Sequence, residues 1–296
     1  MSVQPVTPRI DSHHHVWDPA TRDYPWLQDL DGINRPFTVD DFRPLLEANG
    51  FNGSVLVQTV SDMGETNLFL ELATATPFIL GVVGWVDLEK LDVDADIRLL
   101  RESPGGNFLV GIRHQVHDEE DPDWLLRAEV LRGLEVVADH ELVYDLLVRP
   151  RELPAAITVA RDYPHLRFVV DHIAKPPIAS GEIEGWASLM HEFAGLENVA
   201  CKLSGMVTEA GDAGWSVDDL LPYVRTVVEI FGHDRLMFGS DWPVCLLAAS
   251  YEEVVRATRE ALERLEVLTP EADAAIFGGT AAHWYNLDIQ HLVETA

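Results

Sequence analysis

The sequence predicts an α/β chain that closes into a single (β/α)8 barrel of the TIM type. Short apolar segments of strand length alternate with amphipathic segments of helix length, and this alternation occurs eight times. Near-continuous apolar strands, such as residues 54–57 and 167–170, indicate burial on both faces, as in parallel sheets. Eight such units favour closure into a barrel. An open doubly wound sheet is the alternative, but its Rossmann version requires a G-x-G-x-x-G turn after an early strand, and we find none.

The length of the chain agrees with one barrel domain spanning residues 1–296. A chain of 296 residues with 47% hydrophobic residues fits either two average domains or one barrel, which commonly needs about 250 residues. We find no linker-like stretch, low-complexity run or internal repeat that would divide it. We therefore expect a single domain with a long aromatic loop after the first strand.

The strand candidates are apolar and bounded by turn or helix signals. In chain order they are residues 9–13, 53–59, 80–86, 108–113, 141–148, 166–171, 198–203 and 235–240. The helix candidates between and after them are amphipathic. In order they cover residues 39–49, 63–74, 92–101, 123–139, 152–162, 184–193, 216–231 and 250–265. Ser250 with Glu253 has capping-box spacing, and Gly50 and Gly232 follow helices where a left-handed C-terminal cap is needed.

Polar and aromatic residues follow the C-terminal end of nearly every predicted strand. In chain order they are His13 and His15, Gln58 and Thr59, Trp85 and Asp87, Arg113 and His114, Arg149, Asp171 and His172, Lys202 and Ser204, and Asp241 and Trp242. In a (β/α)8 barrel these ends line one face, and that face carries the active site. Any one of these residues has a structural explanation, so it is their convergence that predicts a site.

The His13-His14-His15 run has the spacing of a ligand pair. Residues i and i+2 of a strand point to the same side, so His13 and His15 can aim at one point beyond the strand while His14 faces away. An expression tag or a solvated surface run is the alternative. A tag is longer and terminal, whereas this run follows residues 9–11 and precedes an aromatic loop.

That loop, residues 16–37, is too long and too aromatic for an ordinary connection. We expect it to cover the mouth of the barrel, with Trp17, Tyr24, Trp26 and Phe37 as its aromatic residues. Such rings suit the apolar faces of a sugar, but they also serve to anchor a loop, and both roles stay open.

Composition excludes several classes of function. The formal net charge of −29, without a local basic cluster, disfavours nucleic-acid binding and anionic membranes and indicates solubility, including in a high-salt cytoplasm. We find no apolar run of about 18 residues and no signal-peptide pattern at the N-terminus, so a cytoplasmic protein is expected. Cys201 and Cys245 are too few for a disulfide framework and lie in apolar surroundings, so reduced, packed thiols are expected.

The chain resembles the amidohydrolase superfamily, and within it the sugar-lactonase branch that contains L-fuconolactonase-like and L-rhamnonolactonase-like enzymes. The segments that carry the resemblance are residues 10–19, 24–27, 111–114, 171–176, 201–205 and 238–244. The resemblance implies a lactone hydrolase of carbohydrate metabolism in which His13, His15, His172 and Asp241 surround the reacting carbonyl. Binuclear members carry a bridging Lys or Glu on the fourth strand and a His on the fifth. Here the fourth strand ends in Arg113-His114, and residues 142–147 of the fifth strand include no histidine. We therefore do not expect two metals.

We therefore expect at most one divalent ion, Zn²⁺ in preference, on His13, His15, His172 and Asp241, and a metal-independent mechanism also stays open. Asp241 and His172 are the expected catalytic residues, with Asp241 moving the proton of the attacking water. The expected contacts to a small lactone substrate are Arg113, His114, Trp26 and Lys202. Arg113 has a salt bridge at the barrel rim as its alternative role, and Lys202 has an ion pair with a neighbour such as Asp171.

Two other functions stay open from sequence alone. A related amidohydrolase branch with a similar His-x-His and Asp arrangement decarboxylates aromatic acids, and a barrel that only binds sugars would have structural histidines. The sequence does not identify the lactone, and it leaves the oligomeric state open, including a homo-oligomer.

Overall fold

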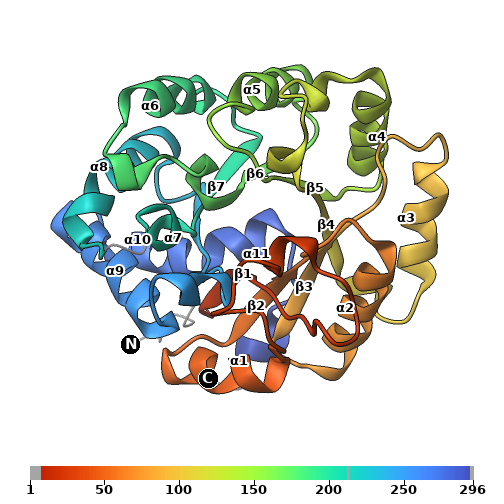
Figure 1. Cartoon of the computed structure of the whole chain (residues 1–296), viewed down its shortest axis with the longest axis horizontal. Helices are drawn as coiled ribbons and strands as arrows, with labels where there is room; N and C mark the ends of the chain where they lie inside the picture. The colour runs from red at the N-terminus through yellow and green to blue at the C-terminus, as the bar shows by residue number, and fades with distance from the viewer. Residues whose placement is uncertain (1–7, 212–213, 294–296) are drawn as a thin grey trace, which may run out of the picture.

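The computed structural model describes residues 8–211 and 214–293, and it contains one sheet of eight parallel strands in the order β1 to β8. Figure 1 shows the strands in the middle of the molecule and the helices around them. The backbone N–H of His15 donates to the carbonyl of Trp242 at 2.7 Å, and a parallel bridge joins His14 to Trp242, so the first and last strands meet. The predicted (β/α)8 barrel is confirmed.

All eight strands lie where the pattern placed them, and six of them are shorter than predicted, the exceptions being the first and the fourth. They are β1 Ile10–His14, β2 Gly53–Val57, β3 Ile79–Gly84, β4 Leu109–His114, β5 Val143–Leu146, β6 Phe168–Val170, β7 Val199–Leu203 and β8 Leu236–Phe238. The predicted sixth strand included Asp171, which instead begins a tight turn. The backbone leaves the ladder there because the chain turns at the mouth of the barrel.

The main helices of the barrel also lie where they were predicted, apart from the start of α4. They are α1 Val39–Ala48, α2 Met63–Ala75, α3 Val93–Glu102, α4 Ala128–Asp139, α5 Leu153–Asp162, α6 Glu184–Met190, α8 Val217–Phe231 and α9 Tyr251–Arg264, with the short α7 Met206–Glu209 after β7. The capping box of Ser250 and Glu253 is present, and Gly50 and Gly232 have φ of +76° and +60°.

The predicted helix over 123–139 is wrong at its start. A 3-10 turn covers Trp124–Leu126, and α4 begins only at Ala128, because Arg127 is extended with φ −62° and ψ 138°. Trp124 is buried and stacks on His114 with ring centroids 4.2 Å apart, so this segment packs across the end of β4.

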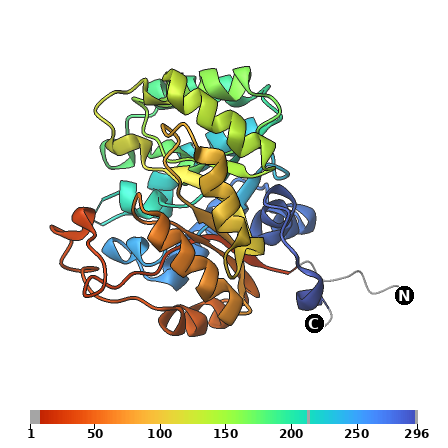
Figure 2. The same cartoon turned by 90° about the vertical axis from the view of Figure 1, so that its right-hand side faces the viewer.

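The chain beyond Leu265 was not assigned from the sequence and forms a cover for the barrel. It contains α10 Pro270–Ala274, a π-type turn Ala275–Gly279, α11 Thr280–Trp284 and α12 Gln290–Val293. Ala281, Trp284, Tyr285 and Leu287 pack with apolar side chains inside the barrel. In Figure 2 these dark-blue helices lie at the opposite end of the barrel from the red segment that follows β1.

Two smaller expectations concern the cysteines and membranes. Cys201 and Cys245 are free and buried, as predicted. Within the described part of the chain, no helix combines the length and the apolar character needed to cross a membrane.

Candidate active site

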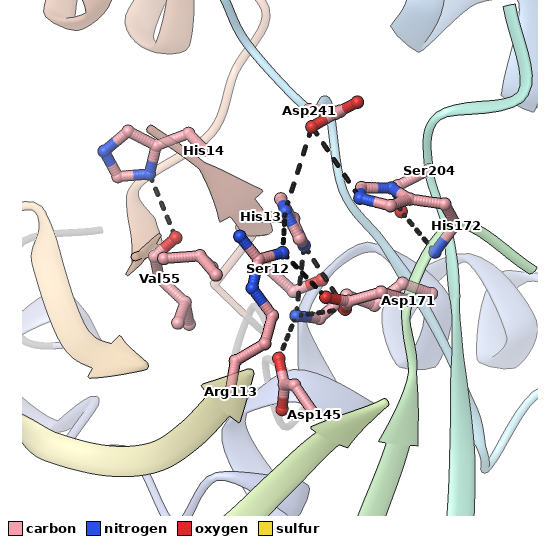
Figure 3. A network of polar contacts seen from close by, with 12 residues as sticks. Ser12, His13, His14, Val55, Arg113, Asp145, Asp171, His172, Ser204 and Asp241 are labelled. Carbon is pink, nitrogen blue, oxygen red and sulfur yellow. Dashed lines mark hydrogen bonds and ion pairs between the residues drawn. The ribbon is translucent and has the colours of Figure 1, made fainter. Parts of the chain in front are cut away.

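Four side chains from three distant parts of the sequence meet at the C-terminal ends of the strands. His13 lies in β1, His15 follows it, His172 follows β6 and Asp241 follows β8. All four are buried, with at most 4% of each residue exposed. Figure 3 shows the Asp241 carboxylate facing the rings of His13 and His172. The convergence expected for a barrel is therefore what the structure shows for these residues.

The distances among these side chains suit a single metal ion. His13 Nε2 lies 3.2 Å from His15 Nε2, and Asp241 Oδ1 lies 3.4 Å from His15 Nε2, 3.8 Å from His13 Nε2 and 3.9 Å from His172 Nε2. Ligands about 2.0–2.1 Å from a tetrahedral Zn²⁺ are about 3.3 Å from one another. His13, His172 and Asp241 each offer a ligand atom, and these atoms all lie within 4.8 Å of one another. The donor set therefore fits one divalent ion.

The second ring nitrogens of two histidines are held by neighbouring strands. His15 Nδ1 lies 2.7 Å from the carbonyl oxygen of Val57. Since a carbonyl oxygen only accepts hydrogen bonds, Nδ1 carries the ring proton and donates it. His172 Nδ1 lies 2.9 Å from the hydroxyl of Ser204. Both rings thus turn Nε2 toward Asp241, and such outer partners are typical of metal-ligating histidines.

His14 confirms the alternation of the strand. Its ring faces away from the site, stacks on Phe42 with centroids 4.2 Å apart, and places Nδ1 3.0 Å from the carbonyl of Val55. Its contact with Val55 is visible in Figure 3.

A left-handed turn sets the direction of His172. His172, Ile173, Ala174 and Lys175 have φ between +46° and +59°, which is rare for residues with a side chain and most unusual for β-branched isoleucine. Gly205 packs directly against the turn, and a Cβ there would lie 2.8 Å from His172 atoms. Sparsely populated backbone conformations of this kind cluster at functional sites, where the surroundings hold them in place.

Burial decides the protonation of the site. It lowers the pKa of His172 to about 3 and also lowers the pKa of His15. Burial alone would raise the pKa of Asp241, but the imidazoles of His172, His15 and His13 around the carboxylate outweigh burial, so the pKa of Asp241 lies below its ordinary value. At neutral pH the site holds neutral imidazoles and an ionised carboxylate, the forms that bind metals.

The cations beneath the site are already paired. Arg113 Nη1 lies 2.9 Å from Asp171 Oδ2, and Lys202 Nζ lies 2.6 Å from Asp145 Oδ2 and 3.0 Å from Asp171 Oδ1. By contrast, the described residues place no Lys or Arg within ion-pair distance of Asp241. Two cations balance two carboxylates, and Asp241 is left with a negative charge that a bound cation would offset.

A cavity of about 290 Å³ opens onto these groups. It is lined by residues that include His15, Trp26, Arg113, His172, Lys175 and Asp241. Larger hollows of about 510 and 570 Å³ lie elsewhere on the surface, but none of these six residues lines them.

The four expected substrate contacts are placed differently from one another. Trp26 and Arg113 line the cavity. His114 lines a neighbouring hollow of about 430 Å³, where it stacks on Trp124 and binds Glu119 at 2.8 Å. Lys202 is fully buried, in the ion pair that was its alternative role.

Sequence reasoning did not assign several residues that the structure brings to the site. Lys175 and His117 line the cavity and Asp145 lies beneath it, whereas Arg149, which also lines the cavity, was among the predicted strand-end residues. Lys175 falls within the motif of residues 171–176, so its position was noted but not its role. A charged residue inside the apolar fifth strand was the available signal for Asp145.

Comparison with known proteins finds similarity over nearly the whole chain. Residues 10–287 match the family model described as "Amidohydrolase". An L-fucono-1,5-lactonase of Burkholderia ambifaria is 43% identical over 290 residues, covering 96% of this chain and 97% of that protein, and one of Burkholderia multivorans is 37% identical over 290 residues, covering 94% and 96%. A crystal structure of a Burkholderia multivorans amidohydrolase with bound zinc superposes with a TM-score of 0.88 at 37% identity, covering 95% of this chain and 100% of that one.

Proposed function

From the premise that the chain belongs to the amidohydrolase family, we propose that it hydrolyses the ester bond of a small sugar lactone. The observation that carries the proposal is the near full-length similarity to two L-fucono-1,5-lactonases. The convergence of three histidines and an ionised aspartate supports it, with His15, His172 and Asp241 lining one small cavity and His13 buried beside them. A 1,5-lactone of a deoxyaldonic acid such as L-fuconic acid is the proposed substrate.

The cavity suits a compact substrate. Its volume of about 290 Å³ lies at the low end of the range of about 300–1,000 Å³ for small-molecule sites. Trp26 offers an aromatic ring for the apolar side of a sugar, and Arg113 offers directed donors for its oxygens. His114, in the neighbouring hollow, is proposed to contact only substituents that extend beyond the sugar ring.

Asp241 is the proposed base. Its carboxylate is ionised at neutral pH and lines the cavity, so it can accept the proton of the water that attacks the lactone carbonyl. The same group, now protonated, can return the proton to the ring oxygen as the ester bond breaks, which balances the reaction without another acid. His172 Nε2, 3.9 Å from Asp241 Oδ1, is proposed to orient the water and the carbonyl.

A single Zn²⁺ is the proposed cofactor, held by His13, His15, His172 and Asp241. When bound, such an ion polarises the carbonyl and lowers the pKa of water. Arg113 offers a second source of positive charge, because its Nη1 lies 3.3 Å from His13 Nε2 at the cavity wall. A mechanism in which Arg113 and the imidazoles stabilise the developing oxyanion without metal is therefore the alternative to be tested.

The test is a panel of aldonolactones and aromatic lactones, assayed by acidification of a weakly buffered solution with and without chelator. We expect turnover of 1,5-aldonolactones, and loss of turnover after chelation that added Zn²⁺ restores. Activity that survives complete metal removal would support the metal-independent alternative. No turnover of any lactone, with carbon dioxide released from aromatic acids, would replace the proposal by decarboxylation, and sugar binding without turnover would replace it by a binding barrel.

A further inference from the structure

A buried ion pair interrupts the apolar interior of the barrel. Side chains such as Val55, Val143, Val169 and Met237 fill it. Among them lie Lys202 of β7 and Asp145 of β5, both fully buried, with Lys202 Nζ 2.6 Å from Asp145 Oδ2. Neither residue lines the cavity described above.

Lys202 directs its ammonium at the underside of the site. Besides Asp145, Lys202 Nζ contacts Asp171 Oδ1 at 3.0 Å and His13 Nδ1 at 3.2 Å. Its hydrogen bond to a carboxylate goes to Asp145, whereas Asp171 Oδ1 is held by ion-pair contact and accepts no hydrogen bond among the described residues. His13 Nδ1 also lies 3.4 Å from Asp171 Oδ1, so the ring edge of His13 rests between a cation and a carboxylate. Figure 3 shows Asp145 and Asp171 on the side of His13 away from Asp241.

The ion pair is held from the other end of the barrel. Tyr285, which follows α11, directs its hydroxyl into the barrel, where Oη lies 2.8 Å from each carboxylate oxygen of Asp145. Tyr285 is 2% exposed and packs with Trp284 and Leu287 in the cover of the barrel. A continuous chain of contacts thus runs from the C-terminal cover through Asp145 and Lys202 to His13.

The stability of the fold does not explain this arrangement. Removing two charges from water costs several kcal/mol per ion, and apolar pairs of similar volume serve a core as well or better in the cases measured. A buried pair that breaks an otherwise apolar interior therefore calls for another role. Its contacts with His13 and Asp171 supply one.

We propose that Lys202 and Asp145, supported by Tyr285, are positioning residues that fix His13 and Asp171 for the reaction. Only the kinetic test of this proposal rests on the proposed function. Asp171 in turn receives Arg113 at 2.9 Å, so the ammonium of Lys202 sets the place of His13 directly and of Arg113, which lines the cavity, through Asp171. Outer partners of metal-ligating histidines are commonly worth about 10–100-fold in activity or metal affinity.

The experiment separates positioning from stability by a double replacement. Lys202→Met alone leaves Asp145 buried without its cation, and we expect both thermal stability and kcat to fall. Lys202→Met with Asp145→Leu removes both charges, so stability should recover. If the pair positions His13, kcat of this double variant stays about 10–100-fold below that of the native protein while KM changes little. Recovery of kcat together with stability would overturn the proposal.

Two further variants keep the test decisive. Tyr285→Phe removes a single hydroxyl, so it should fold even where Lys202→Met does not, and we expect kcat to fall several-fold with KM unchanged. Unchanged kcat in this variant would count against the proposal. Arg235→Met is the matched control, because Arg235 donates to the carbonyls of Leu196 and Val199 without contacting the site, and it should change stability only.

Calorimetric titration with Zn²⁺ alone gives a readout that does not depend on turnover. We expect the double variant to bind zinc about 10–100-fold more weakly than the native protein, because His13 is no longer held. If the native protein hydrolyses no lactone yet this difference in zinc affinity is found, the proposed function fails and the positioning role stands. If the double variant and the native protein bind zinc equally but differ in kcat, the ion pair positions Asp171 and Arg113 and not His13. If they are equal in both zinc affinity and kcat, the positioning role is overturned.

Discussion

The two ends of the barrel differ in kind, although the same eight strands run between them. At the C-terminal ends of the strands lie histidines, aspartates and Arg113 around a cavity. At the other end, Trp284, Leu287 and Ala281 pack against the apolar interior and cover it. Figure 2 shows the segment after β1 and the final helices at these opposite ends. One end carries the chemistry and the other completes the core, and Tyr285 is a residue of the second end that reaches the first.

Mutations at the two ends of the barrel should therefore have different effects on activity and on stability. Replacements at the cavity end should lower activity and leave stability nearly intact, because those side chains contact little of the apolar core. Replacements in the cover other than Tyr285, which reaches Asp145, should lower stability and leave the kcat of folded molecules intact. The four predictions below test this division, beginning with the largest expected effect.

Asp241→Asn should lower turnover by about 10²–10⁴-fold, the usual contribution of general acid–base catalysis. The amide keeps the shape of the carboxylate but cannot take a proton from water. Thermal stability should change little, as measured by calorimetry beside the steady-state assay. Asp234→Asn is the control, because Asp234 is exposed and precedes β8 at the covered end. Near-normal turnover of the Asp241 variant would mean that the base lies elsewhere, with His172, His114 and Asp171 the next candidates.

Trp284→Ala should lower the free energy of unfolding by about 3–5 kcal/mol, the usual cost of deleting a large buried aromatic side chain. Trp284 is 6% exposed and packs into the interior of the barrel. The kcat per folded molecule should stay within a factor of two or so of the native value, since the residue is absent from the cavity lining. Denaturant unfolding with activity measured below the transition checks both. Leu91→Ala is the control, because Leu91 is 89% exposed.

The division between the ends also explains what could be predicted from sequence. The strands, the opposite directions of His13 and His14, and the capping box at Ser250 follow from local periodicity and spacing. The left-handed turn at Ile173 does not, because no residue there has an intrinsic preference for positive φ, and contacts such as that of Gly205 hold it in place. The cover after Leu265 was missed because its helices are short and broken by glycine at positions 278 and 279.

The site shows the same limit. Asp241 and the histidines follow strand ends, so the barrel topology alone brings them together. The contacts of Asp145 with Lys202 and with Tyr285 join residues 57 and 140 positions apart in the sequence, and only the closed barrel with its cover produces them. For that reason Lys202 was expected as a substrate contact with an ion pair as the alternative, and the alternative is what the structure shows.

Acid should destabilise the protein through His14, which belongs to the cavity end by position but to the core by packing. Burial lowers the pKa of His14 to about 3 from 6.5. Below pH 6.5 the unfolded chain therefore takes up a proton that the folded chain does not, so stability falls as the pH falls from 6.5 toward 3. The loss is at most about 1.4 kcal/mol per pH unit for one such group.

His14→Asn should reduce this slope between pH 6.5 and 5.5, as measured by denaturant midpoints at each pH. Burial also raises the pKa of Asp11 to about 6, which acts in the opposite sense, so the comparison of variant with native protein is the informative quantity. His165→Asn is the control, because His165 is exposed at the surface and should leave the slope unchanged. An identical slope in the His14 variant would mean that His14 is not kept neutral by the fold.

The smallest effect should come from salt, and it should act on neither end of the barrel selectively. The net charge of −29 arises from 50 acidic and 21 basic residues, so the protein carries a large excess of carboxylates that repel one another. Raising ionic strength from about 0.1 to 1 M shortens the screening length from about 10 to 3 Å and weakens this repulsion. With like-charge contacts at about 0.2–0.5 kcal/mol each, relief of several raises Tm by about 2–4 °C.

The ion pairs of Lys202 and Arg113 are buried and screened far less, so KM for a neutral lactone should stay constant across the same range. Calorimetry and kinetics in KCl, with sorbitol as the uncharged control, measure both quantities. A Tm that rises equally in sorbitol would assign the effect to solvent exclusion and not to charge, and a KM that changes with salt would mean that surface charge reaches the cavity.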